Sequence, residues 1–240
     1  MKRLLIRGIN GRMGRSVSEY ARNENFNVVC GVDKKIIGNV DCPVYKNFSE
    51  VRDYVDVIID FSSAENLDDL LTFATQTNTP AAICVTGFND EQLKKINAAS
   101  ETLPIYLSPN TSQGVNLLKK ICKTISSSLG DFEAEIIETH HKNKADAPSG
   151  TAKLLYEEIA NQKNFPVYGR TGKRKENEIG LHSVRGGNAF GEHECKFFFG
   201  NECISVKHTA FSSSVFAIGA LKAARYILGK TPGLYNSYDY

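Results

Sequence analysis

The sequence lacks any hydrophobic run long enough to cross a membrane. A membrane-spanning helix needs roughly 18 to 20 apolar residues, whereas the N-terminal Met-Lys-Arg leads into only Leu4, Leu5 and Ile6 before Arg7. We therefore expect no signal peptide and no membrane partner. The sequence also lacks a Cys-x-x-Cys pair, although it contains six cysteines. Scattered cysteines without a secretory signal indicate reduced thiols and a cytoplasmic protein.

An excess of one charge is absent as well. The 29 lysines and arginines nearly balance the 27 aspartates and glutamates, which leaves a formal net charge of +2. This balance argues against a nucleic-acid partner and against an acidic tail. There is no internal repeat and no low-complexity tract. The 240 residues, 41% of them hydrophobic and 10% aromatic, have the composition of a packed globular protein with one large domain or two modest ones.

The first hundred residues alternate between strand-like and helix-like segments. Short apolar runs predict strands at 4–6, 26–32, 55–61, 81–85 and 105–107. Helical spacing predicts helices at 13–22, 64–75 and 90–99. Strands that alternate with helices in this way predict an α/β fold with a parallel, doubly wound sheet.

The pattern changes after Gly114. We expect helices at about 115–127 and 150–161, a strand at 132–139, and a loop-like stretch that ends in an exposed, basic connection at 169–177. Three strand-like runs follow at 180–185, 192–199 and 202–207, with the turn-forming pair Gly200-Asn201 between the last two. A final helix at 214–228 could return to pack on the first domain.

Three glycines follow the first predicted strand and begin the first predicted helix. Gly8, Gly11 and Gly14 have G-x-x-G-x-x-G spacing, and residues without Cβ let backbone N–H groups approach a pyrophosphate at a helix N-terminus. A tight strand-to-helix turn also needs glycine, so this motif is weak by itself. Asp33 strengthens it, because Asp33 ends the second predicted strand about 20 residues later, where a dinucleotide fold places the carboxylate that binds the adenosine ribose.

The residues after this aspartate leave the choice of nucleotide open. Lys34 and Lys35 follow at once, and cations at this point can pair with a 2′-phosphate, whereas Asp33 would repel it. The two lysines are equally compatible with a solvated strand end. The sequence therefore permits NADH, NADPH or both.

The segment from residue 138 to residue 152 concentrates groups that carry chemistry. His140, His141 and Lys144 follow a predicted strand, and Ser149-Gly150-Thr151 begins a predicted helix. Helix N-terminal amides and hydroxyls can hold a carboxylate, the lysine adds positive charge, and a histidine donates a proton near neutral pH. This constellation suits a small dicarboxylate. The plainer interpretations are that Ser149 only caps the helix and that one histidine is structural.

This segment resembles the signature of the dihydrodipicolinate reductase family, which reads E-x-H-H-x-x-K-x-D-x-P-S-G-T-A. The sequence matches every fixed position between Glu138 and Ala152. The resemblance extends along nearly the whole chain. It includes the Gly8 to Gly14 turn, Ile59-Asp60-Phe61-Ser62, Thr86-Gly87-Phe88, Pro109-Asn110 with Gly114-Val115-Asn116, and Arg185-Gly-Gly with Gly191-Glu192-His193.

The resemblance implies a reductase in lysine and diaminopimelate biosynthesis that reduces 4-hydroxy-tetrahydrodipicolinate, a cyclic dicarboxylate, with NADPH, NADH or both. It implies a Rossmann-type dinucleotide-binding domain formed by residues 1–111 and 212–240. A smaller α+β domain with a mixed sheet, residues 112–211, would bind substrate and make the contacts of a homotetramer.

Site residues carry over position by position. The resemblance implies that His140 and Lys144 are catalytic and that His141, Ser149, Gly150 and Thr151 bind substrate. The residues that it implies for cofactor binding are Gly8, Asn10, Gly11, Arg12, Met13, Gly14, Asp33, Lys34, Phe61, Thr86, Pro109 and Asn110. The sequence departs from the family pattern at Cys84 and Val85, where relatives usually have Gly-Thr, at Thr111, where a Phe is common, and at Ser213, usually Arg.

Three other functions compete with this interpretation. One is a different NAD(P)-dependent oxidoreductase on the same two-domain plan, because fold alone determines no substrate. Another is a nucleotide-sensing protein without catalysis, which the changes at Cys84 and Val85 favour and the intact His140 and Lys144 oppose. The third is a metal enzyme, but adjacent histidines without an i, i+4 partner suit zinc poorly, so we expect no metal.

Overall fold

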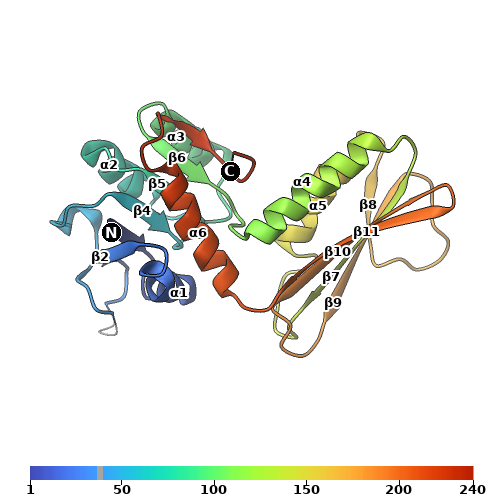
Figure 1. Cartoon of the computed structure of the whole chain (residues 1–240), viewed down its shortest axis with the longest axis horizontal. Helices are drawn as coiled ribbons and strands as arrows, with labels where there is room; N and C mark the ends of the chain where they lie inside the picture. Colours follow the sequence, from blue (N-terminus) through green and yellow to red (C-terminus); the bar gives the residue numbers. More distant parts are fainter. Residues whose placement is uncertain (37–39, 240) are drawn as a thin grey trace. The chain divides into compact units, whose positions relative to one another are not determined.

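The computed structural model of the chain describes residues 1–36 and 40–239 (Figure 1). Its contacts divide the chain into two compact units. The first unit contains residues 1 to 113 together with the residues from 214 onward, and the second contains residues 114 to 213. Among the described residues, no helix combines the length and hydropathy needed to span a membrane.

The first unit contains a seven-stranded sheet in which every strand pair is parallel. The strand order is β12-β6-β5-β4-β1-β2-β3. The strands are β1 (Lys2–Arg7), β2 (Phe26–Val32), β3 (Val44–Tyr45), β4 (Val57–Asp60), β5 (Ala81–Ile83), β6 (Pro104–Leu107) and β12 (Gly233–Tyr235). The predicted doubly wound sheet is confirmed.

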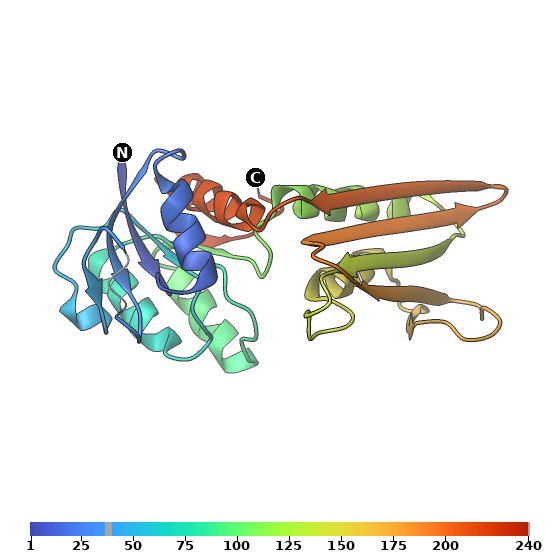
Figure 2. The ribbon, with the colours of Figure 1, turned by 90° about the horizontal axis from the view of Figure 1, so that it is seen from below.

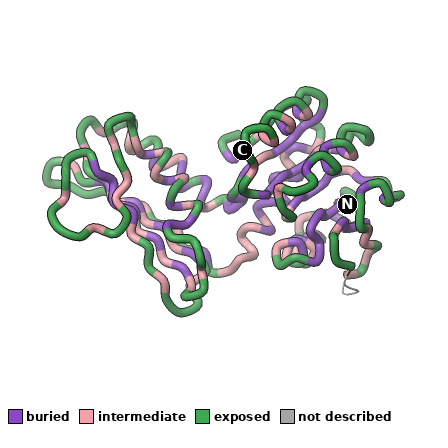
Figure 3. Tube along the Cα trace, turned by 180° about the vertical axis from the view of Figure 1, so that it is seen from behind, coloured by how far each residue is buried: buried purple, intermediate pink, exposed green. Residues whose placement is uncertain are grey.

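Helices cover both faces of this sheet. On one face, α1 (Arg12–Ala21) and α6 (Ser214–Ile227) form an apolar core with the strands. On the other face, α2 (Leu67–Thr77) and α3 (Asp90–Ser100) do the same, and the 3-10 helix η1 (Phe48–Glu50) adds Phe48. Residues of the central strands, such as Leu4 to Ile6, are fully buried, as continuous apolar runs predict. Figure 3 shows the buried chain concentrated in these strands.

The second unit contains a five-stranded mixed sheet in the order β11-β10-β7-β9-β8. Its strands are β7 (Glu133–His140), β8 (Phe165–Tyr168), β9 (Glu178–Arg185), β10 (Gly191–Phe199) and β11 (Glu202–Ala210). The pairs β7·β9 and β8·β9 are parallel, whereas β10 pairs antiparallel with β7 and β11. Helices α4 (Gln113–Ser128) and α5 (Gly150–Ile159) share one apolar core with one face of the sheet, seen in Figure 2.

The sequence analysis missed three short strands, and all three are edges of their sheets. β3 and β12 lie at the two ends of the first sheet, and β8 lies at one end of the second, inside the stretch expected to be loop. β8 also contains Pro166, which cannot donate a ladder hydrogen bond and therefore suits an edge. Strands of two to four residues have too little periodicity to be recognised without their partners.

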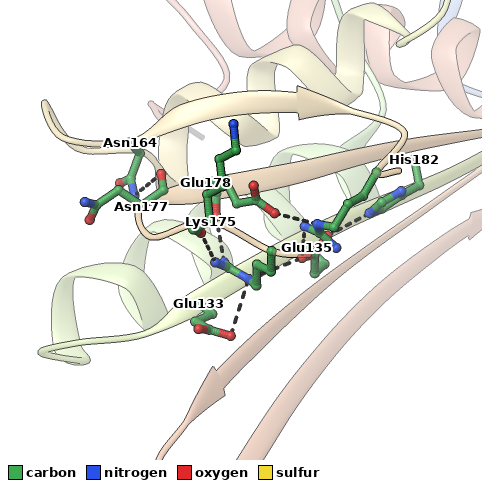
Figure 4. A network of polar contacts seen from close by, with 9 residues as sticks. Glu133, Glu135, Asn164, Lys175, Asn177, Glu178 and His182 are labelled. Carbon is green, nitrogen blue, oxygen red and sulfur yellow. Dashed lines mark hydrogen bonds and ion pairs between the residues drawn. The ribbon is translucent and has the colours of Figure 1, made fainter. Parts of the chain in front are cut away.

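The basic connection at 169–177 is exposed except at its two arginines, which are half-buried. Its arginines bind glutamates on the face of the second sheet opposite the helices, and Figure 4 shows Glu135 and Glu178 in this network. Arg170 reaches Glu135 and Glu178 at 2.5 Å each, and Arg174 donates to the Glu178 carbonyl at 2.7 Å. The Glu135 carboxylate also contacts His182 Nε2 at 2.7 Å. The predicted exposed connection is confirmed for most of these residues, and the contacts of Arg170 and Arg174 attach it to the sheet.

Candidate active site

At the glycine-rich turn after β1, segments of backbone approach each other too closely for a side chain to lie between them. Gly8 has a φ of +79°, which favours glycine, and a Cβ there would lie 3.1 Å from the backbone of Phe61 and Ser62. A Cβ on Gly14 would lie 2.1 Å from the Gly8 carbonyl oxygen, so helix α1 can pack this close to the turn only with glycine at position 14. Gly11 is exposed and its N–H donates to the Gly8 carbonyl at 3.0 Å. This turn fits the phosphate-binding role expected from the sequence.

Asp33 lies beside this turn at the end of β2. Its Oδ2 accepts from the Asn10 N–H at 3.0 Å, and its Oδ1 accepts from the Lys35 N–H at 3.1 Å. The Asn10 side chain donates to the Lys35 carbonyl at 2.5 Å, which closes the link between the two loops. Each carboxylate oxygen keeps a further lone pair for a ribose hydroxyl.

A cavity of about 530 Å³ opens at this point of the first unit. Of the predicted cofactor residues, those that line it are Gly8, Asn10, Gly11, Asp33, Lys34 and Phe61. Arg12 is exposed at the start of α1, Met13 packs against the core, and Gly14 is buried under the turn. The volume lies within the range of small-molecule sites.

Three predicted cofactor residues and three departures from the family pattern, Cys84, Val85 and Thr111, lie elsewhere in the first unit, whereas the fourth departure, Ser213, ends the second unit. Thr86 and Pro109 are exposed beyond β5 and β6, and Asn110 is buried. Cys84 is buried, and burial raises its pKa well above the usual range, so this thiol stays protonated. Thr111 is also buried and donates to the Phe216 carbonyl at 2.6 Å, so it ties the loop after β6 to α6.

A buried ion pair that the sequence analysis did not single out supports the cavity. Arg7 Nη1 lies 2.8 Å from Asp60 Oδ2, and Asp60 is fully buried. Arg7 Nη2 also donates to the carbonyls of Glu65 and Asn66 at 2.8 and 2.9 Å, while Asp60 Oδ1 accepts from Ser62. Arg7 thereby holds the loop from Ser62 to Asn66 at the cavity wall. In the sequence, the only sign of this ion pair is that each of the apolar runs at 4–6 and 57–59 is followed directly by a charged residue, Arg7 and Asp60.

The catalytic segment predicted from the sequence lies in the second unit. His140 is the last residue of β7 and is buried, whereas His141 lies beyond the strand and is half-buried. The Lys144 N–H donates to the His141 carbonyl at 3.1 Å in a tight turn. The Lys144 ammonium pairs with Asp146 at 2.7 Å, and this contact holds the pKa of the Asp146 carboxyl below its usual range.

Ser149 is the N-cap of α5. Its Oγ accepts from the Ala152 N–H at 3.2 Å, so the capping interpretation is confirmed. The same Oγ lies 3.1 Å from His193 Nε2. Gly150 and Thr151 begin the helix, with Gly150 exposed and Thr151 half-buried. The positive end of the α5 dipole therefore lies a few residues from Lys144, as a carboxylate site requires.

Glu138 and Arg185 join these groups into one network. One oxygen of Glu138 accepts from Arg185 at 2.8 Å and from the Ser149 N–H at 3.1 Å, and the other lies 2.5 Å from His140 Nδ1. Burial raises the pKa of Glu138, but its bonds to His140 and Arg185 outweigh burial and hold it well below its usual range. The carboxylate stays ionised.

His193 lies beside this network, although the sequence analysis assigned it no role in the reaction. Its ring lies edge-on to that of His140 with centroids 5.1 Å apart, and burial lowers its pKa to about 3. Among the described residues, Glu138, His140 and His193 are the group whose ligand atoms all lie within 4.8 Å. Arg185 already binds the Glu138 carboxylate, so a cation held by this group would face the charge of Arg185.

These features together define a class of protein. A Rossmann-type unit with a glycine-rich turn beside Asp33, followed by a mixed-sheet unit with a buried histidine network, has the plan of a two-domain, pyridine-nucleotide-dependent oxidoreductase. Sequence models of dihydrodipicolinate reductase match both parts, its N-terminus over residues 2–111 and its C-terminus over residues 114–240. The chain belongs to the dihydrodipicolinate reductase family.

Known proteins agree with this assignment. The chain is 43% identical to the 4-hydroxy-tetrahydrodipicolinate reductase of Clostridium tetani, over 98% of this chain and 95% of that one. It is 44% identical to the enzyme of the same name from Caldanaerobacter subterraneus, over 100% and 98%. The dipicolinate-bound dihydrodipicolinate reductase from Paenisporosarcina superposes with a TM-score of 0.83 at 26% identity, covering 98% and 97% of the chains.

More distant structures share the fold alone. A myo-inositol dehydrogenase from Corynebacterium glutamicum superposes with a TM-score of 0.61 at 16% identity, over 97% of this chain and 91% of that one. The two-domain plan therefore supports several substrates, and the residues of the second unit must determine which one is used.

Proposed function

We propose that the chain catalyses the NAD(P)H-dependent reduction of 4-hydroxy-tetrahydrodipicolinate to tetrahydrodipicolinate in lysine and diaminopimelate biosynthesis. The observation that carries this proposal is the network of the second unit, where His140, Lys144 and the N-terminus of α5 follow one strand end. The balanced reaction takes one hydride and one proton and releases water. The two relatives with 43% and 44% identity carry the name of this activity.

The second unit supplies the groups that a cyclic dicarboxylate needs. We assign one substrate carboxylate to the N-terminus of α5, with Ser149, Gly150 and Thr151 around it. We assign to His141 and Lys144 the binding of the negatively charged groups of the substrate. A substrate carboxylate would compete with Asp146 for the Lys144 ammonium group. The Paenisporosarcina reductase has dipicolinate bound, and dipicolinate is a planar dicarboxylate.

Proton delivery is assigned to His140. Nδ1 of His140 faces a carboxylate at 2.5 Å, so its other ring nitrogen, Nε2, is the atom that gives up a proton. Lys144 orients the substrate and balances its negative charge during the reaction. The bound nicotinamide supplies the hydride, and the residues of this chain supply orientation and the proton.

The first unit is assigned to NADH or NADPH. The turn from Gly8 to Gly14 and the cavity beside Asp33 fit an adenosine ribose and a pyrophosphate. Thr86, Pro109 and Asn110 are assigned to the rest of the dinucleotide. Lys34 pairs with Glu65 at 2.8 Å, and both side chains are exposed, so a 2′-phosphate would compete with a weak surface pair.

We also propose a homotetramer in the cytoplasm. The face of the second sheet opposite α4 and α5 carries Ile137, Val184 and Phe198 beside its charged side chains, and a sheet contact between copies would cover them. The six cysteines are all free, which suits a reducing compartment.

The test is oxidation of NADH and of NADPH by the purified chain, with the substrate generated in place from pyruvate and aspartate semialdehyde. We expect oxidation that depends on substrate, and a loss of about a hundredfold or more in Lys144→Ala. Lys142→Ala is the matched control, because Lys142 is an exposed lysine of the same loop. The two nucleotide rates report cofactor preference.

Two results would replace this proposal. If both nucleotides bind but neither is consumed, the changes at Cys84, Val85 and Thr111 have converted the chain into a nucleotide sensor. If Lys144→Ala and Lys142→Ala behave alike, the segment does not act on this substrate, and another oxidoreductase activity must be sought. Membership of the family argues against both results.

A further inference from the structure

Glu138 is a charged residue on the core-facing side of β7, where apolar residues are expected. Side chains on β7 alternate, so Glu138 points to the same face of the sheet as Ala134 and Ile136, which belong to the apolar core. Its exposure is only 1%. An ionised carboxylate there is unfavourable by several kcal/mol unless other groups satisfy its oxygens. Its partners therefore indicate what the residue does.

The partners of Glu138 come from three separate segments. Arg185 on β9 donates to Oε1 at 2.8 Å, and the same guanidinium nitrogen reaches the Asp146 carbonyl at 2.6 Å. The N–H of Ser149 donates to Oε1 at 3.1 Å, and His140 Nδ1 lies 2.5 Å from Oε2. The carboxylate thus touches the assigned proton donor and the N-cap of the assigned carboxylate site at once.

The contact with Oε2 determines which nitrogen of His140 carries its permanent proton. An ionised carboxylate only accepts hydrogen bonds, so Nδ1 must be the donor in the neutral ring and in the imidazolium alike. The exchangeable proton is then on Nε2. A Cβ on residue 191 would lie 3.2 Å from Nε2, so Gly191 leaves this nitrogen uncovered on that side.

The contact with Oε1 determines where the carboxylate site begins. Ser149 directly precedes the first turn of α5, and its N–H bond to Glu138 ties that turn to the end of β7. The side chain of Glu138 therefore links His140 directly to the N-terminus of α5. A substrate bound at the N-terminus of α5 is therefore held in one orientation relative to Nε2 of His140.

We propose that Glu138 is a positioning residue for the reduction, acting through His140 and Ser149: it fixes the Nδ1–H tautomer of His140 and holds the carboxylate site at a set distance from Nε2. This inference rests on the function proposed above and adds a residue to it.

The charges around His140 show why a carboxylate is needed there. Arg185 on β9 and Lys144 in the loop after β7 are positive. His193 on β10 is neutral near pH 7, because burial lowers its pKa to about 3, and burial also lowers the pKa of His208 on β11. An imidazolium at His140 therefore has Glu138 as its counter-charge in direct contact.

The test compares Glu138→Gln with Glu135→Gln. Glutamine keeps the shape of Glu138, but its amide removes the charge, and its NH₂ group can face Nδ1 and force the opposite tautomer. Glu135 is the matched control, because it lies on the same strand and binds an arginine and a histidine, on the opposite face of the sheet (Figure 4). Both variants and the unaltered chain are measured for melting temperature, NADPH affinity, dipicolinate affinity and kcat/KM against pH.

We expect Glu138→Gln to lose about a hundredfold or more in kcat/KM at neutral pH. Its pH profile should differ from that of the unaltered chain, because His140 loses the carboxylate that contacts Nδ1. Dipicolinate should bind more weakly and NADPH equally well. Glu135→Gln should keep the original pH profile even if its melting temperature falls.

The inference fails if Glu138→Gln retains the original pH profile and dipicolinate affinity while the unaltered chain turns over. If the unaltered chain itself does not turn over, the proposed function fails instead, so the two failures are distinguishable. Nitrogen-15 NMR of the histidine-labelled, unaltered chain provides a second measurement that needs no folded Glu138 variant. A neutral His140 with its proton on Nδ1 agrees with the proposal, and a proton on Nε2 refutes it.

Discussion

The buried pair of Arg7 and Asp60 provides the sharpest test of how the nucleotide-binding unit is stabilised. Substituting Arg7 by methionine keeps much of the side-chain volume and removes the charge. Asp60 is fully buried and Arg7 nearly so, and their atoms are 2.8 Å apart. Breaking a buried pair by removing one partner costs about 3 to 5 kcal/mol, because the other charge is left without compensation. A domain is stable by only about 5 to 15 kcal/mol in total.

The pH dependence of this effect follows from the pKa of Asp60. Burial raises the pKa of Asp60, while Arg7 and Ser62 act in the opposite direction and compensate only in part. A carboxyl group with a raised pKa in the folded state contributes its stability below the unfolded pKa and loses it as the pH rises. Without Arg7 the pKa rises further, so we expect Arg7→Met to be more destabilising at pH 7 than at pH 4.5.

The assay is urea unfolding of the full chain at both pH values, followed by circular dichroism and tyrosine fluorescence, because the chain has no tryptophan. Arg3→Met is the matched control: Arg3 is on the same strand and pairs with Asp56 at 2.9 Å, but its side chain is 44% exposed. We expect a much smaller effect there. Equal effects of the two substitutions, or a loss below about 1 kcal/mol in Arg7→Met at pH 7, would refute the reasoning.

Three further predictions concern the turn, the cofactor and acid stability. Gly14→Ala should abolish NAD(P)H binding or folding, since its Cβ would lie 2.1 Å from the Gly8 carbonyl oxygen; calorimetry showing unchanged affinity contradicts this. Asp33→Asn should shift the ratio of NADPH to NADH affinity toward NADPH by about tenfold, because it removes the charge that repels a 2′-phosphate; an unchanged ratio argues against contact with the ribose. His193→Gln should flatten the loss of stability between pH 6.5 and 4. A histidine whose pKa falls to about 3 on folding destabilises the fold as the pH drops below 6.5, so an unchanged slope in urea titrations would show that His193 is not the cause.

The first unit was predictable because its signals are local. Apolar runs covered on both faces mark β1, β2, β4 and β5, and the predicted range 26–32 coincides with β2. Gly14 is required by its contact with the nearby Gly8 carbonyl, so the spacing of this pair is visible in the sequence itself, whereas the contacts of Gly8 with Phe61 and Ser62 are not. The three missed strands are edges, whose formation depends on a neighbour and not on their own pattern.

The candidate site was predictable only in part. The residues from His140 to Thr151 are contiguous, and their chemistry could be recognised together. The structure added Arg185 and His193, which lie 47 and 44 residues from the groups they contact. Nothing in the spacing of Glu138 and Arg185 predicts that they meet, because β7 and β9 are brought side by side only by the pairing of the second sheet.

By itself, the sequence determined the alternation that builds a Rossmann-type sheet, the glycine-rich turn after its first strand and the segment of histidines, lysine and serine proposed to act on the substrate. Each of these depends on neighbours in the chain, where spacing and periodicity carry the information. The tertiary structure alone decided which buried charges are paired: Arg7 with Asp60, 53 residues away, and Glu138 with Arg185 and His140. A buried charge is stable only where partners from several strands satisfy it, and those partners are chosen by sheet order and register.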